Sequence, residues 1–278
     1  MKGAIRRVRR FVRESDILVR RLLGSRAAWL HCELERLRRC GSHEATTTVL
    51  GPPLRLSQAR FFEPMYRDIF EREIYKFDAV DAAPRIIDCG ANIGMASIYL
   101  GRRHPGARIT AFEADSDLAA LARANLNAFG LGNVEVIAAA VTACGETVHF
   151  AATGDLAGRV GRHVTGEVAA TRVVPAVRLA PYLEEPIEFL KIDIEGAEAS
   201  VLASVADRLG NVRRLFVEYH GFSADEQDLP QLLEMLKRSG FRYYVTSACD
   251  FRRSPLCDLS TNCGMDLQLN IFCVRPGA

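Results

Sequence analysis

Short apolar runs alternate with amphipathic stretches along most of this 278-residue chain. Runs of strand length occur at residues 86–89, 108–113, 133–138, 188–193, 212–218, 241–246 and 267–274. Apolar positions at helical spacing occur between them, at about residues 93–104, 116–129, 197–208 and 227–239. This alternation predicts an α/β fold, with parallel strands and crossover helices on both faces of the sheet.

Two segments depart from the alternation. The run "LQLNIFCV" (267–274) follows the preceding strand through a loop without a helix, so we expect an antiparallel strand at the edge of the sheet. Residues 144–178 hold two β-like runs, "ETVHF" and "TRVVPAVRL", around a glycine-containing connection. We expect a hairpin-like insertion there.

The N-terminal part has a different pattern. Residues 3–23 place apolar side chains at roughly helical spacing with arginines between them, which predicts a basic amphipathic helix. Residues 26–40 continue in the same style, and residues 41–56 have the composition of a linker. A further helix around Phe61 to Phe77, within residues 57–83, is expected to lead into the core.

Charge separates the N-terminal part from the rest. Residues 1–40 hold twelve Lys and Arg against four Asp and Glu, whereas the remainder holds 24 against 30. The basic region is compatible with an anionic membrane surface, an acidic partner, a second subunit or a solvated capping helix. We divide the chain into a basic helical extension with its linker, residues 1–56, and one larger domain, residues 57–278.

The composition excludes some classes. Hydrophobic residues make up 49% and charged residues 25%, which is enough to build a core. No apolar run approaches the roughly 20 residues that cross a bilayer, and none near the N-terminus has the roughly 7 to 15 of a secretory signal. We expect a cytoplasmic protein whose eight cysteines are mostly free thiols, and their spacing fits no common zinc pattern.

The stretch "DCGANIG" lies at the carboxyl end of a predicted strand, where open α/β sheets bind ligands. Gly90 permits a tight turn and a close backbone approach, and Gly94 permits close packing of a helix on a strand. Glu113 ends the next strand, where an acid can accept hydrogen bonds from both ribose hydroxyls. Together they indicate an adenosine-containing cofactor. A pyrophosphate is disfavoured because Asn92 replaces the middle glycine of G-x-G-x-x-G.

Two further strands end in polar residues. Asp193 and Glu195 follow a buried strand in "FLKIDIEGAE", and buried acids are costly unless they bind something. They are candidates for a base, a metal ligand or a substrate clamp, unless one of them caps the helix expected from about Ala197. Glu218 and His220 end the strand in "LFVEYHGF", and His is the commonest general base.

These motifs resemble a known family. "DCGANIG", "FEAD", "NLNAFGL", "LKIDIEGAE" and "VEYHG", in this order, resemble the FkbM-type S-adenosylmethionine-dependent methyltransferases over roughly residues 84–246. The resemblance implies a class I (Rossmann-like) seven-stranded methyltransferase sheet whose last strand is antiparallel. It also implies O-methylation of a hydroxyl on a sugar, glycolipid or polyketide-type natural product.

The resemblance also assigns the cofactor residues. Asp88, Gly90 and Asn92 would line the methionine end of S-adenosylmethionine, together with the turn at Gly94. Glu113 would hold the ribose. Near the adenosine it implies Ala114 and Asp115, and adenine contacts through the backbone or Thr142.

For the reaction, the protein must align acceptor, methyl and sulfur, and help to remove a proton. We expect His220 or Asp193 to take the proton, with Glu195 and Glu218 orienting the substrate. An alternative is Mg²⁺ held by Asp193 and Glu218, since carboxylates suit that ion and a metal lowers the pKa of a bound hydroxyl.

Other functions remain open at this point. They are an N- or carboxyl-methyltransferase, a nicotinamide-dependent dehydrogenase and a non-catalytic scaffold. Nucleic acid is not expected as a partner, because the larger domain is acidic and shows no aromatic Pro-Pro-Tyr element for a flipped base. We expect acceptor determinants in residues 152–170, in residues 247–266 and in the N-terminal region. The basic residues 1–40 make a peripheral contact with the inner membrane surface, or a homodimer, attractive hypotheses.

Overall fold

The structure, a computed structural model, describes residues 26–143, 146–152, 158–160, 171–249, 256–257 and 260–277. The chain divides into two units, Met1–Arg67 and Asp68–Ala278. The basic helix expected over residues 3–23 lies outside the described residues. The division at residues 56 and 57 into an extension and a larger domain stays a prediction.

The first unit contains the helix expected over residues 26–40. This helix, α2 (Arg26–Cys40), buries Leu34 and Leu37. The two leucines are three positions apart and therefore lie on the same face of the helix. The apolar spacing of the sequence thus predicts both the helix and its buried side.

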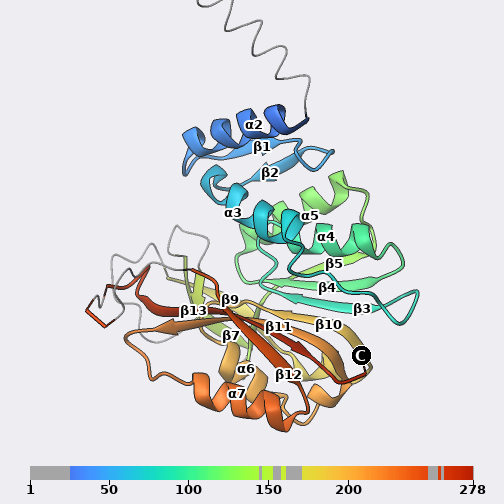
Figure 1. The fold of residues 1–278 in the computed structure, drawn as a ribbon, viewed down its shortest axis with the longest axis vertical. Helices are drawn as coiled ribbons and strands as arrows, with labels where there is room; N and C mark the ends of the chain where they lie inside the picture. The colour runs from blue at the N-terminus through green and yellow to red at the C-terminus, as the bar shows by residue number, and fades with distance from the viewer. Residues whose placement is uncertain are drawn as a thin grey trace, which may run out of the picture. The chain divides into compact units, whose positions relative to one another are not determined.

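Residues 41–56 are not simply a linker. They contain β1 (Ala45–Thr47) and β2 (Leu54–Leu56), which pair antiparallel (Figure 1). Both leucines of β2 are buried and the arginine between them is exposed, which is the alternation of a strand with one buried face. The linker prediction is wrong for these residues because three-residue strands are too short to show a clear period.

The helix expected around Phe61 to Phe77 ends early. Three short helical segments occur instead: η1 (Ala59–Phe61), α3 (Phe62–Tyr66) and η2 (Arg67–Glu71). Glu73 then has a positive φ of 51°, which a helix does not allow. The rings of Tyr75 and Phe77 lie 6.0 and 5.3 Å from the ring of Phe189, so these aromatic residues pack on the sheet rather than continue a helix.

The second unit is built on a seven-stranded sheet in the order β12-β13-β11-β10-β3-β4-β5. In chain order the strands are β3 (Arg85–Cys89), β4 (Arg108–Glu113), β5 (Val134–Ala138), β10 (Ile187–Ile192), β11 (Val212–Phe222), β12 (Arg242–Ser247) and β13 (Met265–Val274). The pairs from β11 to β5 are all parallel. All seven predicted strands are therefore present, and the fold is that of class I methyltransferases.

The last strand is antiparallel, as predicted. β13 pairs antiparallel with both β11 and β12. Its expected place at the edge is wrong, because β13 inserts between these two strands and leaves β12 at the edge. A strand that returns through a loop can pair on either side of its predecessor, and the sequence pattern does not say which side it takes.

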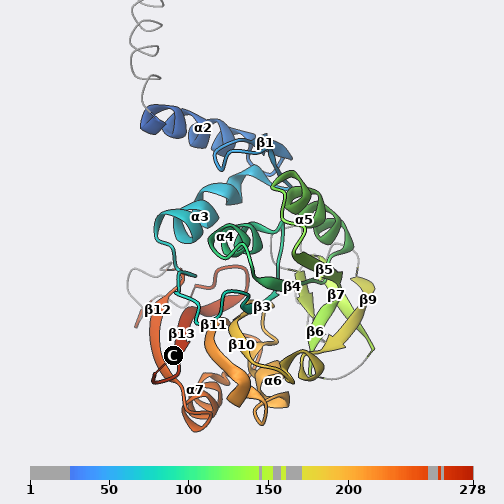
Figure 2. The ribbon, with the colours of Figure 1, turned by 90° about the vertical axis from the view of Figure 1, so that its right-hand side faces the viewer.

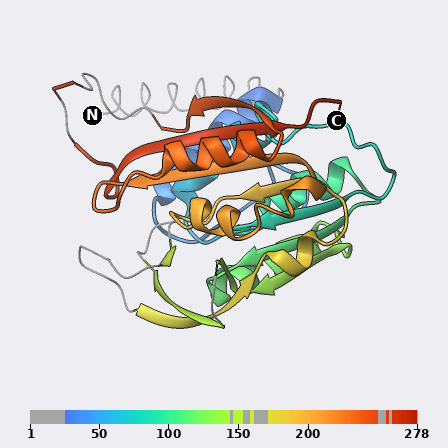
Figure 3. The same cartoon turned by 90° about the horizontal axis from the view of Figure 1, so that it is seen from below.

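Helices cover both faces of the sheet (Figures 1 and 2). α4 (Met95–Arg103) and α5 (Ser116–Ala128) lie on one face. α6 (Glu198–Ser204) and α7 (Leu229–Arg238) lie on the other, and Figure 3 shows them, in amber and orange, across the near side of the strands. All four helices fall within the expected ranges, with ends shifted by a few residues.

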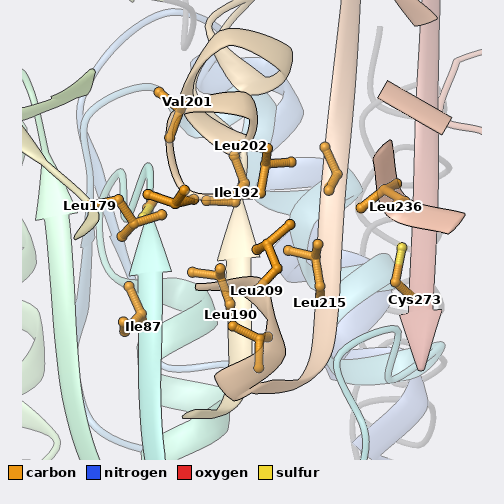
Figure 4. Packing of buried hydrophobic residues seen from close by; sticks show 14 of the residues in the cluster. Ile87, Leu179, Leu190, Ile192, Val201, Leu202, Leu209, Leu215, Leu236 and Cys273 are labelled. Carbon is orange, nitrogen blue, oxygen red and sulfur yellow. The ribbon is translucent and has the colours of Figure 1, made fainter. Parts of the chain in front are cut away.

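The main core lies between the sheet and α6 and α7 (Figure 4). Strand residues meet helix residues there, and the fully buried ones include Leu190, Ile192, Val201, Leu202 and Leu236. β10 is buried along its whole length, as expected for a central parallel strand covered on both faces. The polar residues that follow β10 therefore begin where the buried strand ends.

A smaller sheet follows β5. β6 (Ala140–Thr142), β7 (Thr147–Ala152), β8 (Gly158–Val160) and β9 (Thr171–Arg178) pair in the order β6-β9-β7-β8. β7 pairs antiparallel with β8 and with β9, so the hairpin-like insertion is confirmed for its described residues. η3 (Ala180–Leu183) then leads into β10, and η4 (Leu209–Asn211) precedes β11.

Among the helices of the described residues, none combines the length and apolar character needed to span a bilayer.

Candidate active site

Four neighbouring strands of the large sheet carry polar residues at their carboxyl ends. They are β11, β10, β3 and β4, in this spatial order. From β3 the chain moves outward to β4 and β5, and it then returns to pair β10 on the other side of β3. Strand order therefore reverses between β3 and β10, and ligands of open α/β sheets bind at such a switch point.

The turn after β3 lies directly against the end of β10. Gly90 has a φ of 85°, and a methyl group there would lie 1.8 Å from the backbone carbonyl oxygen of Asp193. Only glycine fits this position, because both the conformation and the close approach exclude a side chain. The close backbone approach expected at Gly90 is present. It is an approach to the backbone of Asp193.

The rest of the turn positions the start of α4. Asn92 has a φ of 51°, and its side-chain Oδ1 accepts a hydrogen bond from the backbone N–H of Ile93 at 2.7 Å. Gly94 caps α4 with a φ of 90°. The nearest atoms to a methyl group at Gly94 would be those of Ala122 in α5, at 3.5 Å. The close packing expected at Gly94 therefore joins two helices, and the expectation of a strand as its neighbour is wrong.

Glu113 ends β4 and closes the same turn. It is buried, and its two oxygens accept the backbone N–H groups of Asn92 at 2.7 Å and Asp115 at 2.9 Å. Burial raises the pKa of Glu113, and the two backbone hydrogen bonds oppose that rise. Each carboxylate oxygen can accept a second hydrogen bond, so Glu113 retains acceptor capacity for a ligand.

The remaining residues assigned to the cofactor follow β4 or lie in β6. Asp115 is the N-cap of α5, and its Oδ1 accepts the backbone N–H groups of Asp117 and Leu118. Ala114, beside it, is half-buried. Thr142 is buried in β6, the short strand that follows β5. Their part in binding a cofactor stays a prediction.

Lys191, which the sequence analysis did not single out, joins the ends of β3 and β10. It is buried, and its Nζ lies 3.3 Å from Asp88 and 3.1 Å from Asp193. It also donates a hydrogen bond to the carbonyl oxygen of Gly90 at 3.0 Å. Burial opposes the charge of Lys191, but the carboxylates of Asp193 and Asp88 outweigh burial and raise its pKa.

Asp88 is fully buried beside Lys191. Its Oδ2 accepts a hydrogen bond from the hydroxyl of Ser97 at 2.7 Å. The side chains of Ser97 and Lys191 thus hold this carboxylate from two sides. A contact with the cofactor at Asp88 stays a prediction.

The segment after β10 turns sharply. Glu195 has a φ of 57° and Gly196 a φ of 101°. Neither Asp193 nor Glu195 caps the following helix, whose N-cap Ala197 has no side-chain hydrogen bond. Glu198 instead accepts the backbone N–H of Gly196 at 3.0 Å. The helix-capping alternative is therefore wrong for both predicted acids.

His220 lies close to three carboxylates. Its Nδ1 lies 2.9 Å from Glu198, and its Nε2 lies 3.6 Å from Glu195 and 3.8 Å from Glu218. Ligand atoms of Asp193, Glu195 and His220 all lie within 4.8 Å of one another. The structure thus brings together all four residues predicted as catalytic.

Gln268, from β13, completes this cluster. It pairs opposite His220 in the antiparallel ladder, and its Nε2 donates a hydrogen bond to Glu218 at 2.6 Å. The same nitrogen lies 3.4 Å from Nε2 of His220. The antiparallel strand therefore contributes directly to the site.

Burial dominates the electrostatics of the cluster. It raises the pKa of Glu195 and of Glu218 to about 7 each, with Asp193 adding to both rises and His220 opposing them. For His220, burial favours the neutral ring, but Glu195 and Glu198 outweigh it and raise the pKa. The cluster therefore contains several groups that can take up a proton near or above neutral pH.

The residues that sequence reasoning missed carried weak signals. Lys191 lies two positions before Asp193, so the two share one face of the strand, but a lysine in an apolar strand was not interpreted as a partner for the acids. Glu198 lies in the quoted motif without a role assigned to it. Gln268 is polar in the otherwise mostly apolar run "LQLNIFCV". Only the strand order puts Gln268 beside His220.

Comparison with known proteins gives a family match. The sequence model described as "Methyltransferase FkbM domain" matches residues 88–243. AMB antimetabolite synthetase AmbE of Pseudomonas aeruginosa is 28% identical over 261 residues, covering 77% of this chain and 12% of that protein. Methyltransferase sdnD of Sordaria araneosa is 27% identical over 212 residues, covering 64% of this chain and 81% of that protein.

Solved structures with a similar fold include a complex with AdoMet and a methyltransferase. TYW2 of M. jannaschii in complex with AdoMet has a TM-score of 0.47 and 14% identity, covering 85% of this chain and 88% of that chain. Methyltransferase FkbM from Methylobacillus flagellatus KT has a TM-score of 0.47 and 16% identity, covering 75% of this chain and 48% of that chain.

Proposed function

Since the chain belongs to the FkbM methyltransferase family and is an S-adenosylmethionine-dependent methyltransferase, we propose that it O-methylates a small-molecule hydroxyl. The observation that carries this proposal is His220, buried at a strand end beside Glu195 and Glu218. A hydroxyl acceptor must lose a proton as it is methylated, so a positioned base is worth more for an alcohol than for an amine. An N- or carboxyl-methyltransferase is the alternative.

The turn after β3 fits the proposed cofactor. Glu113 would accept hydrogen bonds from the ribose hydroxyls with the acceptor capacity that its backbone bonds leave free. The glycine backbone at Gly90 and Gly94 and the side chain of Asn92 would border the methionine end, with Asp88 below. Adenosine would lie beside Ala114, Asp115 and Thr142.

Calorimetry with S-adenosylhomocysteine tests this placement. Glu113→Ala should weaken binding by about tenfold or more, since a lost hydrogen bond to a charged group costs about 1.5–3 kcal/mol. Arg172 forms an exposed ion pair with Asp117 on α5, so Asp117→Ala is a nearby control that should leave affinity unchanged. Unaltered affinity in Glu113→Ala would exclude the ribose role.

S-adenosylmethionine, when bound, supplies a methyl group that its sulfonium makes electrophilic. The protein then has to hold the acceptor oxygen and receive its proton. Nε2 of His220 would take the hydroxyl proton, or else Asp193 would, while Glu195 and Glu218 orient the acceptor. Overall, the acceptor would exchange its hydroxyl proton for the methyl group. The O–H and methyl–sulfur bonds would break and the O–CH₃ bond would form, with the proton left on the protein and the sulfur keeping its electron pair in S-adenosylhomocysteine.

The acceptor can be sought without knowing its identity. Radiolabelled methyl groups from S-adenosylmethionine should be transferred to a small-molecule extract of a strain that lacks this gene, and mass spectrometry should show a metabolite that gains one methylene. His220→Ala or Asp193→Asn should lower this turnover by about 10²–10⁴-fold, while cofactor affinity stays unchanged. Near wild-type turnover in both variants would reject the assignment of the base.

A divalent cation is the second form of the mechanism. The sequence suggests Asp193 and Glu218 as its ligands; a different set is Asp193, Glu195 and His220, whose ligand atoms lie within 4.8 Å of one another. Carboxylates with one imidazole fit Mg²⁺ less well than a transition metal. Such an ion would lower the pKa of the acceptor hydroxyl. Turnover that survives exhaustive EDTA treatment would exclude this form.

A glycolipid or lipid-linked acceptor is the substrate class that we favour within this proposal. The excess of basic residues in residues 1–40 supports it, because such segments attract anionic membrane surfaces. A homodimer through the same residues is the alternative use. The location that we propose is the cytoplasm, with peripheral contact at the inner membrane surface.

A further inference from the structure

Glu198 is a buried carboxylate that the proposed reaction has not yet used. It is the first residue of α6 and 1% exposed. A carboxylate so deeply buried is costly unless other groups compensate it. Its Oε1 lies 2.9 Å from Nδ1 of His220, so Glu198 contacts the proposed base directly.

The other partners of Glu198 are backbone donors. Oε1 accepts the N–H groups of Ile194 at 3.1 Å and Gly196 at 3.0 Å, and Oε2 also accepts from Gly196. A backbone N–H can only donate, so Glu198 acts as an acceptor on both of its oxygens. The hydrogen between Glu198 and His220 therefore belongs on Nδ1 of the ring. In the neutral ring this leaves the lone pair on Nε2.

The opposite side of the ring faces the remaining acids at longer range. The nearest oxygens of Glu195 and Glu218 lie 3.6 and 3.8 Å from Nε2, beyond ordinary hydrogen-bond distance. Among the described residues, the shortest contact of the ring is thus the one at Nδ1, and Nε2 faces the two acids and the amide nitrogen of Gln268, 3.4 Å away.

Glu198 also joins two parts of the site. Its backbone bonds hold the turn that carries Glu195, and its bond to His220 reaches the end of β11. Gly196 within that turn lies so close to Phe222 that a methyl group on it would come within 2.8 Å of the ring. The turn is therefore held from both sides, and Glu198 sets the position of His220 relative to it.

We propose that Glu198 is the positioning residue of the methyl-transfer site, fixing the Nδ1–H tautomer of His220 so that Nε2 receives the proton of the acceptor hydroxyl. This inference deepens the proposed function and rests on the role of His220 as base. A carboxylate that orients a catalytic histidine in this way acts through the ring and does not touch the substrate.

Glu198→Gln tests the proposal. Oε1 is the oxygen that faces Nδ1 and also accepts from Ile194, whereas Oε2 accepts from Gly196. With the glutamine carbonyl in the place of Oε2, the amide takes the place of Oε1 and donates toward Nδ1. This favours the Nε2–H tautomer, which cannot accept a proton at Nε2. Turnover of labelled methyl groups into the extract should fall by about 10²-fold or more. Affinity for S-adenosylhomocysteine should stay within about twofold, because the loss concerns the base and not the cofactor.

Nitrogen-15 spectra of histidine-labelled protein give a readout that does not require the acceptor. The chain has six histidines, and the His220 signals are those missing from His220→Gln. At alkaline pH, where the ring is neutral, wild-type His220 should show the Nδ1–H pattern and Glu198→Gln the Nε2–H pattern. Glu198→Asp, which keeps the carboxylate, should restore the Nδ1–H pattern at least in part.

Glu188→Gln is the matched control. Glu188 is a buried carboxylate of β10 that pairs with Arg213 and Arg214, so its loss should lower stability without changing the tautomer or the turnover per folded molecule. A loss of turnover in Glu198→Gln no larger than in Glu188→Gln would overturn the positioning role. A wild-type tautomer in Glu198→Leu, which has no oxygen to accept from Nδ1, would also overturn it. Full turnover in His220→Ala would instead reject the proposed base, while the tautomer measurement would still decide what Glu198 does.

Discussion

At the scale of single residues, Gly90 is where the turn after β3 lies against the backbone of Asp193 at the end of β10. Gly90→Ala should lower the free energy of unfolding by about 3 kcal/mol or more, because the methyl group would overlap the carbonyl oxygen of Asp193 in a backbone conformation that is itself unfavourable. Gly130→Ala is the control, since Gly130 has a φ of 69° but no atom within 4 Å of the added group. It should cost only about 1 kcal/mol. Equal losses in urea unfolding would show that the turn can move away.

The raised pKa values of Glu195 and Glu218 predict an unusual pH dependence of stability. Each has a folded pKa of about 7 against an ordinary 4.5, so the folded state binds more protons between these values. Stability should therefore fall as the pH rises from about 4.5 to 7. For Glu195 alone the change should be on the order of 2 kcal/mol, at about 1.4 kcal/mol per pKa unit and allowing for partial solvent access.

Urea unfolding at several pH values between 5 and 8 measures this dependence. Glu195→Gln should flatten the fall, whereas Glu226→Gln, at an exposed position, should leave the pH profile of the wild type intact. A profile for Glu195→Gln as steep as that of the wild type would show that Glu195 does not carry the proton.

At the scale of elements, β10 carries Lys191, a buried lysine among the acids of the site. Lys191→Met should lower the free energy of unfolding by about 3–5 kcal/mol, because it leaves the fully buried Asp88 without its charge partner. Lys76→Met removes a lysine that is half exposed and pairs with Glu73, so it should change stability by no more than about 1 kcal/mol. A small loss of stability in Lys191→Met would mean that water or a shift of the protein stabilises the charge of Asp88 in place of the lysine.

The elements themselves were largely predictable, because burial on one side imposes a period that the sequence shows. Seven strands and four helices of the second unit follow from that period. The order of the strands in the sheet does not follow from the period. β13 could have paired on either side of its predecessor, and the apolar pattern is the same in both cases. The helix predicted to reach Phe77 was wrong for a related reason. Apolar side chains such as Tyr75 and Phe77 indicate burial, whether they lie in a helix or on an extended segment.

The candidate site was predictable only as far as strand ends reveal it. Asp193, Glu195, Glu218 and His220 stand out because polar residues directly follow buried strands. Glu198 does not, since it begins a helix and resembles the ordinary acid of a first helical turn. Its function depends on a contact with a residue 22 positions away, and such a contact is a property of the folded chain and not of a local pattern.

At the scale of the whole molecule, charge is divided along the chain. Residues 1–40 carry an excess of basic residues, and the rest carries an excess of acidic ones. A uniformly acidic protein would be repelled by an anionic bilayer, so any attraction has to come from the first segment. Under the proposed function, a lipid-linked acceptor and a membrane-binding segment would act together, because the segment would hold the enzyme near its substrate.

Vesicle co-sedimentation tests the role of the basic segment. Full-length protein should bind phosphatidylglycerol vesicles at low salt, should not bind phosphatidylcholine vesicles, and should be released as salt shortens the screening length. Replacing the four arginines of residues 6–10 with glutamine should weaken binding by about 10²-fold or more, at about 1 kcal/mol for each arginine near the surface. This variant is preferable to deletion of residues 1–40, because that deletion would also remove the buried Leu34 and Leu37 of α2 and so confound charge with packing. If the full-length protein does not bind anionic vesicles, the membrane role is wrong.

Light scattering on the same two proteins tests whether the arginines support a dimer. If the segment holds two copies together, the dimer should dissociate in the glutamine variant.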